Sequence, residues 1–172
     1  MKFKEALLKS IKSLSSNQSL KKSTKHLPIL QEITSLGFLI VEHQFGKYKE
    51  PSKIHDRAYI IGFMLENQAE KFINYMSLYT DKVAICAPVV KEVNVYDIPV
   101  TVDYTNKINI TDYIATEVSV EVYKEYCTTM DVSVKEPMIL VVCWDPMWNR
   151  NATSSTGLFY NIHTVLRHIA KN

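Results

Sequence analysis

Residues 37–64, GFLIVEHQFGKYKEPSKIHDRAYIIGFM, form the stretch that decides the fold. Two apolar runs, residues 37–41 and 57–64, flank a polar loop. Runs of this length that are rich in Val, Ile, Phe and Tyr are typical of β-strands. The sequence therefore predicts two strands joined by a polar loop as the unit on which the rest of the domain is built.

Apolar periodicity predicts the elements on both sides of this unit. The predicted helices cover residues 2–15, 28–36 and 68–79, a fourth from 116 or 117 to 130, and a last one capped by Thr156 and ending near Ile169. The further predicted strands cover residues 82–90, 93–102, 107–114 and 137–144. This order predicts an α/β fold: one domain with a mixed sheet, helices packed on the sheet, and an N-terminal amphipathic helix in front.

Four features refine this prediction. Strands 82–90 and 137–144 are apolar throughout, which is typical of strands in the interior of a sheet. Pro99 has no backbone N–H, and it therefore predicts an edge strand or an irregular connection. Gly62 within a strand indicates a bulge or the close approach of another segment. Asn67 is a suitable N-cap for the helix that follows it.

The composition is that of an ordinary globular protein. Of the 172 residues, 47% are hydrophobic and 22% are charged, which are usual values. No apolar run approaches the roughly 18 residues of a membrane-spanning helix, and the N-terminus lacks the features of a secretion signal. The three cysteines, at positions 86, 127 and 143, are widely spaced, which favours buried thiols in a reducing compartment. We therefore expect a cytoplasmic protein.

Positive charge is concentrated near the N-terminus. Residues 1–25 contain seven lysines and one glutamate, whereas the rest of the chain has 13 basic and 17 acidic residues. We predict a lysine-rich helical arm at residues 1–24 and a mixed α/β domain at residues 25–172. The helix at 2–15 fits either an acidic lipid or nucleic-acid surface, or packing on the domain with solvated lysines. Because the remainder of the chain is acidic overall, we do not expect a nucleic-acid partner for the arm.

Polar residues gather where the two core strands adjoin their loop. In an antiparallel pair, the end of the first strand and the start of the second lie at the same end of the sheet. Arg57 would then pair with an anionic group, and Tyr59 or Trp144 would supply an apolar wall. The same residues also fit a polar loop pair closed by a surface ion pair. The predicted ligand-binding residues are His43, Gln44, His55, Arg57, Tyr59 and Trp144.

The segment WDPMWNR, residues 144–150, follows the most apolar strand. Its two tryptophans, with an aspartate and an arginine, are residues that a stacking pocket would use. Alternatively, Trp144 closes the core and Trp148 anchors the loop. The segment therefore leaves both interpretations open.

No motif specifies a reaction. The chain lacks G-x-G-x-x-G, G-x-x-x-x-G-K-[ST], H-E-x-x-H and G-x-S-x-G, which excludes the most recognisable nucleotide-binding, zinc-protease and hydrolase classes. His43 or His55 with Asp56 leaves proton transfer open, but we predict no catalytic residue and no metal site. We expect a non-catalytic module that binds a small molecule or a partner. The alternative is a protein that forms oligomers through a sheet edge, near residues 93–102, or through the N-terminal helix.

Two short patterns in the core stretch are shared with a known family. Residues Gly37 to Gln44 fit G-[FI]-L-x-[VI]-x-x-Q, and Ala58 to Phe63 fit A-Y-[ILV]-x-x-F. They resemble the regulatory domain of eukaryotic methylenetetrahydrofolate reductase, and the similarity extends over about residues 27–169. The resemblance implies a regulatory fold that binds S-adenosylmethionine. It also implies that a threonine and a serine of the first strand contact the ligand; this chain has Ile40 and His43 there, and keeps only the family's Gln44.

Overall fold

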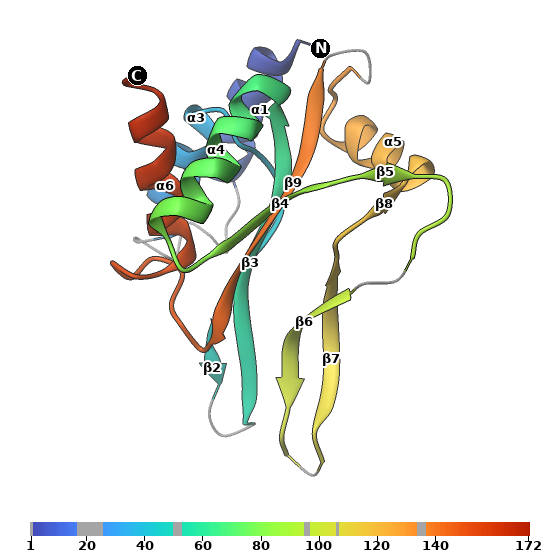
Figure 1. Ribbon diagram of the computed structural model, residues 1–172, viewed down its shortest axis with the longest axis vertical. Helices are drawn as coiled ribbons and strands as arrows, with labels where there is room; N and C mark the ends of the chain where they lie inside the picture. Colours follow the sequence, from blue (N-terminus) through green and yellow to red (C-terminus); the bar gives the residue numbers. More distant parts are fainter. Residues whose placement is uncertain (1, 17–25, 50–52, 95–96, 106, 134–136) are drawn as a thin grey trace.

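Strand β3 (Ile54–Leu65) is the longest described strand and lies at the centre of the protein (Figure 1). It pairs antiparallel with β1 (Leu39–Phe45) on one edge and with β9 (Met138–Trp148) on the other. The structure is a computed structural model that describes residues 2–16, 26–49, 53–94, 97–105, 107–133 and 137–172. The predicted arm at 1–24 therefore lies partly outside the described residues.

Every described strand pair of the main sheet is antiparallel, and its main path has the order β4-β9-β3-β6-β7. Strand β4 is Val83–Ala87, β6 is Asp97–Asp103 and β7 is Asn109–Ala115. Strand β2 (Tyr48–Lys49) pairs with the start of β3. Strand β6 pairs with β3 only at residues 54–56, so most of the β6–β7 hairpin stands apart from β3 in Figure 1. Strands β5 (Val89–Val90) and β8 (Val118–Ser119) form a separate parallel pair.

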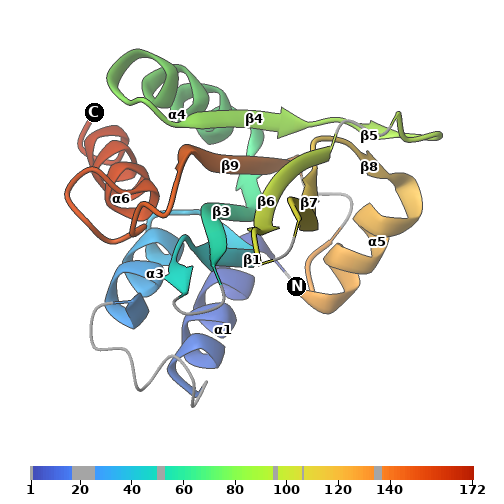
Figure 2. The same ribbon diagram turned by 90° about the horizontal axis from the view of Figure 1, so that it is seen from below.

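Helices cover both faces of the sheet (Figure 2). Helices α3 (His26–Ser35), α4 (Glu66–Tyr79) and α6 (Leu158–Ile169) bury one apolar cluster with Ile60 and Val141. Helix α5 (Val120–Thr129) closes a second cluster with Phe63 and Val142 on the opposite face. The N-terminal helix α1 (Phe3–Ser16) contacts α3 and β1, and it buries Phe3 and Ala6. None of the described helices has the length and apolar character needed to cross a bilayer.

The fold class and the central position of strand 138–148 are confirmed, whereas the predicted central position of strand 82–90 is wrong. Among the described strands, β4 pairs only with β9 and is therefore an edge strand. The strand is apolar for another reason, because helix α4 packs directly on it. Cys127 and Cys143 are buried as predicted, but Cys86 is exposed on this edge strand, and all three thiols are free.

Helix α3 begins at His26 rather than at Pro28. The predicted starts of α4, α5 and α6 are also displaced, because other groups cap these helices. Helix α4 begins at Glu66, whose N–H donates to the carbonyl of Pro137 at 3.0 Å, so that Asn67 is not the cap. Helix α5 begins only at Val120, because residues 118–119 form β8, and Ser119 Oγ accepts from Val122 N–H at 3.2 Å. Helix α6 is preceded by Gly157 rather than by Thr156.

The close approach predicted at Gly62 is confirmed. A Cβ at this position would lie 2.4 Å from the carbonyl oxygen of Leu39 and 2.5 Å from the ring of Phe38. Strand β1 has a register shift beside this point, between Ile40 and Glu42. Gly62 therefore allows β1 to lie against β3 where β1 bulges.

Replacing Gly62 with alanine should destabilise the protein. The added methyl group meets backbone at Leu39, which cannot move without breaking the pairing of β1 with β3. We expect the free energy of unfolding to fall by about 1–3 kcal/mol, the usual cost of overpacking. Urea denaturation measures the change, with Asn74→Ala on the exposed face of α4 as the control. A Gly62→Ala variant as stable as the control would contradict this packing.

Candidate functional site

The polar ends of β1 and β3 meet at one end of the sheet, but their side chains diverge. Gln44 pairs with Tyr59 and Phe45 pairs with Ala58. Because side chains alternate along a strand, neighbours in sequence lie on opposite faces. His43 lies on the face covered by α3 and α6, where its ring is 5.2 Å from Phe45 and 6.2 Å from Phe159 between centroids.

Gln44 and Tyr59 lie on the opposite face and bond within the protein. The Gln44 amide donates to the carbonyls of Arg57 and Val100, both at 3.2 Å. The Tyr59 hydroxyl donates to the carboxylate of Glu42. Burial, followed by this hydrogen bond, raises the pKa of Tyr59. These two side chains therefore connect strands and have little capacity left for a ligand.

The remaining predicted residues lie nearer the end of β9. The Arg57 guanidinium lies 4.1 Å above the ring of Trp148, and burial lowers its pKa. His55 Nδ1 is 3.0 Å from the side-chain nitrogen of Asn149. Trp144 is half-buried against the same apolar cluster as Tyr59. The structure thus brings Arg57 and His55 to one end of the sheet, whereas Trp144 pairs with Tyr59, four residues before Trp148 on β9, and His43 lies on the other face.

The polar residues that follow Trp144 form a buried ion network. Lys82 Nζ lies 3.2 Å from Asp145 Oδ2, and both side chains are fully buried. Arg150 Nε lies 3.5 Å from the same oxygen, and Arg150 also pairs with Asp81 at 2.6 Å. Hydrogen bonds from Lys82 and Arg150 lower the pKa of Asp81 to about 2. Every charge in this network has an opposite partner, and the network joins the start of β4 to the end of β9.

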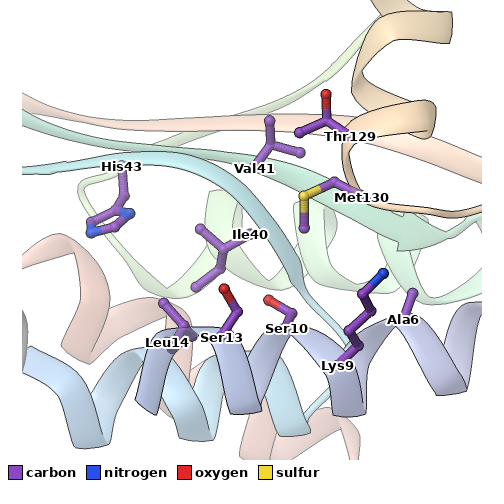
Figure 3. A pocket seen from close by; sticks show the side chains of 10 residues that line it. All are labelled: Ala6, Lys9, Ser10, Ser13, Leu14, Ile40, Val41, His43, Thr129 and Met130. Atoms are coloured by element: carbon purple, nitrogen blue, oxygen red, sulfur yellow. The ribbon is translucent and has the colours of Figure 1, made fainter. Parts of the chain in front are cut away.

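A concave site occurs instead where α1 crosses β1 and meets the end of α5 (Figure 3). We call it the α1–β1 pocket, and its cavity volume is about 250 Å³. Ile40 and Val41 of β1 form part of its wall, and α1 adds further apolar surface. Met130, the C-cap residue of α5, closes another side. His43 is the one sequence-predicted binding residue in its described lining.

Besides Lys9, four side chains bring hydrogen-bonding groups to the α1–β1 pocket: Ser10, Ser13, His43 and Thr129. Within the described part of the chain, none of these four side chains makes a hydrogen bond. Figure 3 shows the two serine hydroxyls rising from α1 toward β1. Burial, and then the nearby His26, lower the pKa of His43. A neutral imidazole has one donor and one acceptor nitrogen, so the pocket offers both types of group.

An exposed ion pair lies at the rim of the α1–β1 pocket. Lys9 Nζ is 3.0 Å from Asp131 Oδ2, and the two side chains are 60% and 51% exposed. Lys9 also lowers the pKa of Asp131. Exposed pairs contribute little stability. This pair can therefore open at small cost, and it links α1 to the end of α5.

Comparison with known families places these elements within one domain. The sequence profile of a family described as a domain of unknown function, DUF6919, matches residues 3–167. The chain belongs to the DUF6919 family. The match begins in α1 and ends in α6, so it includes every element of the α1–β1 pocket. No curated protein matches the chain.

Sequence reasoning did not find the serines of this DUF6919 pocket. Ala6, Ser10 and Ser13 follow one another at spacings of four and three, beside the apolar stripe that Leu14 ends. The small side chains in that row leave room between α1 and β1. A row of small residues at helical spacing was therefore the feature of the sequence that could have indicated the pocket. In the described DUF6919 chain, no group of three or more His, Cys, Asp or Glu side chains could hold a metal ion.

The low pKa of His43 should make the stability of this DUF6919 protein depend on pH. Its pKa is lowered in the folded state, so the unfolded chain binds more protons as the pH falls through about 6.5. The neutral imidazole of His43 therefore makes its full contribution to the free energy of unfolding above that pH, and this contribution is lost as the pH falls below it. We expect His43→Gln to reduce the loss of unfolding free energy between pH 7.5 and pH 5.5, as measured by urea denaturation.

Ser13→Ala is the matched control for this experiment, because it changes the same pocket without removing a titrating group. Its pH dependence should follow that of the wild-type protein. A His43→Gln variant that loses stability with pH as steeply as the wild type would show that His43 does not titrate in this way.

Proposed function

We propose that this protein binds a small molecule, without transforming it, in the α1–β1 pocket. The observation that carries the proposal is a set of four hydrogen-bonding side chains, without a partner among the described residues, in a concave site whose other described lining residues, apart from Lys9, are apolar. Binding sites combine apolar walls with a few placed polar groups in this manner. Ser13 and Thr129 are exposed and Ser10 and His43 are partly buried, so a ligand that bonds to these groups would replace water there without displacing a hydrogen bond of the described structure.

The size and charge of the α1–β1 pocket restrict its ligand. Its volume of about 250 Å³ is below the about 300–1,000 Å³ of pockets for drug-sized ligands. Among the described lining residues, Lys9 alone has a fixed charge, and Asp131 already pairs with it. The lining favours a compact ligand that is apolar on one side and carries neutral hydrogen-bonding groups on the other.

The resemblance of the core stretch to the regulatory domain of methylenetetrahydrofolate reductase also supports the α1–β1 pocket as the ligand site. In the regulatory domain that the core stretch resembles, the ligand-contacting threonine and serine occupy the positions of Ile40 and His43. Both residues line the α1–β1 pocket. S-adenosyl compounds therefore belong in the ligand panel, together with smaller and less charged compounds that match the lining more closely. Ile40 cannot donate a hydrogen bond as a threonine does, and His43 presents an imidazole in place of a hydroxyl, so the preferred ligand is expected to differ.

The chemistry of the lining supports recognition without catalysis. A serine acts as a nucleophile when an adjacent base takes its proton. In the described structure, neither Ser10 nor Ser13 makes a hydrogen bond to His43, and no carboxylate or thiol is among the lining residues. We therefore assign the pocket's polar groups to holding and orienting the ligand.

A ligand panel tests this proposal by thermal unfolding. The panel contains S-adenosylmethionine, S-adenosylhomocysteine, nucleosides and small neutral metabolites at millimolar concentration. A ligand present at 100 times its Kd stabilises the native state by about 2.7 kcal/mol. For a domain of this size, that corresponds to a rise in Tm of about 5–10 °C. At least one compound should produce such a rise.

Ser13→Leu should abolish this rise in Tm by filling the α1–β1 pocket. Ser77→Leu, on the exposed face of α4, is the matched control and should retain it. The proposal is wrong if no compound raises the Tm, or if the rise persists in Ser13→Leu.

Assembly of two copies through β7 is a second candidate. Strand β6 pairs with both β3 and β7, so the edge predicted near residues 93–102 lies at β7 instead. Ile108, Ile110 and Tyr113 beside this edge are 75%, 38% and 48% exposed. A free strand edge with exposed apolar side chains is a template for pairing with another chain. Two antiparallel β7 strands centred between Asn109 and Ile110 would place Lys107 opposite Asp112 of the second copy, a favourable charge pair.

Charge reversal tests this second candidate. Asp112→Lys should reduce the dimer population measured by light scattering, since Lys107 would then face a lysine. Adding Lys107→Asp in the same chain should restore the dimer. Glu121→Lys on α5 is the control for a similar change of net charge. A single-chain mass for the wild-type protein at high concentration would exclude this assembly.

A further inference from the structure

Helices α4 and α6 lie side by side (Figures 1 and 2). Side chains of these two helices line a second concave surface. Two adjoining hollows, of about 280 and 430 Å³, share Thr164 and His168. We call them together the aromatic–basic groove. Its described lining has no residue in common with that of the α1–β1 pocket.

Three rings form a ladder along the first hollow. The rings of Tyr75 and Tyr79 stack with centroids 5.5 Å apart and an angle of 22° between their planes. His168 meets Tyr75 edge-on at 5.0 Å. Tyr79 is 71% exposed, so it still presents open aromatic surface. The ladder is therefore a preorganised platform on which a further planar ring can stack.

The second hollow is lined by cationic groups from the end of α6. Arg167 and Lys171 are exposed and one turn apart, and they lie beside His168. None of the described residues that line the two hollows is acidic. His163 also lines the second hollow, and the carboxylate of Glu32 lies 2.5 Å from its Nε2, so one acidic group borders this hollow through a pairing with the imidazole.

We propose that the aromatic–basic groove binds a nucleoside phosphate unit. The base would stack on Tyr79, and Arg167 with Lys171 would bind the phosphate. Stacking tolerates any base, because every base has a π-face. The guanidinium of arginine matches the geometry of phosphate oxygens, and a lining without acidic groups among the described residues favours an anionic ligand. The unit is either a free nucleotide or one nucleotide of a single strand, since both present the same chemistry.

Equilibrium titration of the full chain at low salt tests this proposal. One arm uses AMP and UMP, followed by NMR, and the other uses a labelled ten-nucleotide oligo(dT), followed by fluorescence anisotropy. Tyr79→Ala and Arg167→Glu should each weaken binding about tenfold or more. Affinity for the oligonucleotide should also fall steeply with added salt. Mononucleotide binding identifies the free ligand, whereas binding of the oligonucleotide alone identifies a single strand.

Matched controls separate the groove from general attraction to a basic protein. Tyr104→Ala removes an exposed tyrosine of the β6–β7 hairpin, and Lys124→Glu reverses a charge on α5. Both variants, and Ser13→Leu in the α1–β1 pocket, should bind as the wild type does. The proposal is overturned if neither probe binds, or if Tyr79→Ala and Arg167→Glu bind no more weakly than these controls.

Discussion

The pairing of β3 with β1 on one edge and with β9 on the other is the constraint on which the structure depends. It aligns the three strands, with register shifts between Ile40 and Glu42 and between Arg57 and Tyr59, and so fixes which side chains lie on each face. Ile60 and Val141 face α3, α4 and α6, whereas Ile61 and Val142 face α5. Gly62 makes the pairing possible where β1 bulges, since any side chain there would meet Leu39.

The same alternation explains how far the sequence could predict the protein. Apolar runs at 37–41, 57–64 and 137–144 sufficed for the fold class and for the central strands. The run at 82–90 was misleading, because an edge strand covered by α4 is as apolar as an interior strand. The groups that cap the helices were less predictable. The N–H of Glu66, at the start of α4, donates to the carbonyl of Pro137, which is remote in sequence.

The candidate site was predictable only in part. Sequence reasoning selected His43, which lines the α1–β1 pocket, but it grouped His43 with residues of the opposite face. Gln44 and Tyr59 use their polar groups to join strands, and Arg57 lies on Trp148. Ser10 and Ser13 were missed because serine on a helix is ordinarily a solvated residue. Their position beside β1 follows from how α1 crosses the sheet, which no local pattern specifies.

The central claim is that α1 lies across β1 so as to leave a ligand site between them. Fragment soaking into crystals of the full chain tests this most directly, since electron density locates a bound compound whatever its chemical class. The account predicts that fragments gather in the α1–β1 pocket, with hydrogen bonds to Ser13 and to the ring of His43. A crystal structure in which the pocket is closed, or in which fragments at high concentration bind only elsewhere, would contradict it.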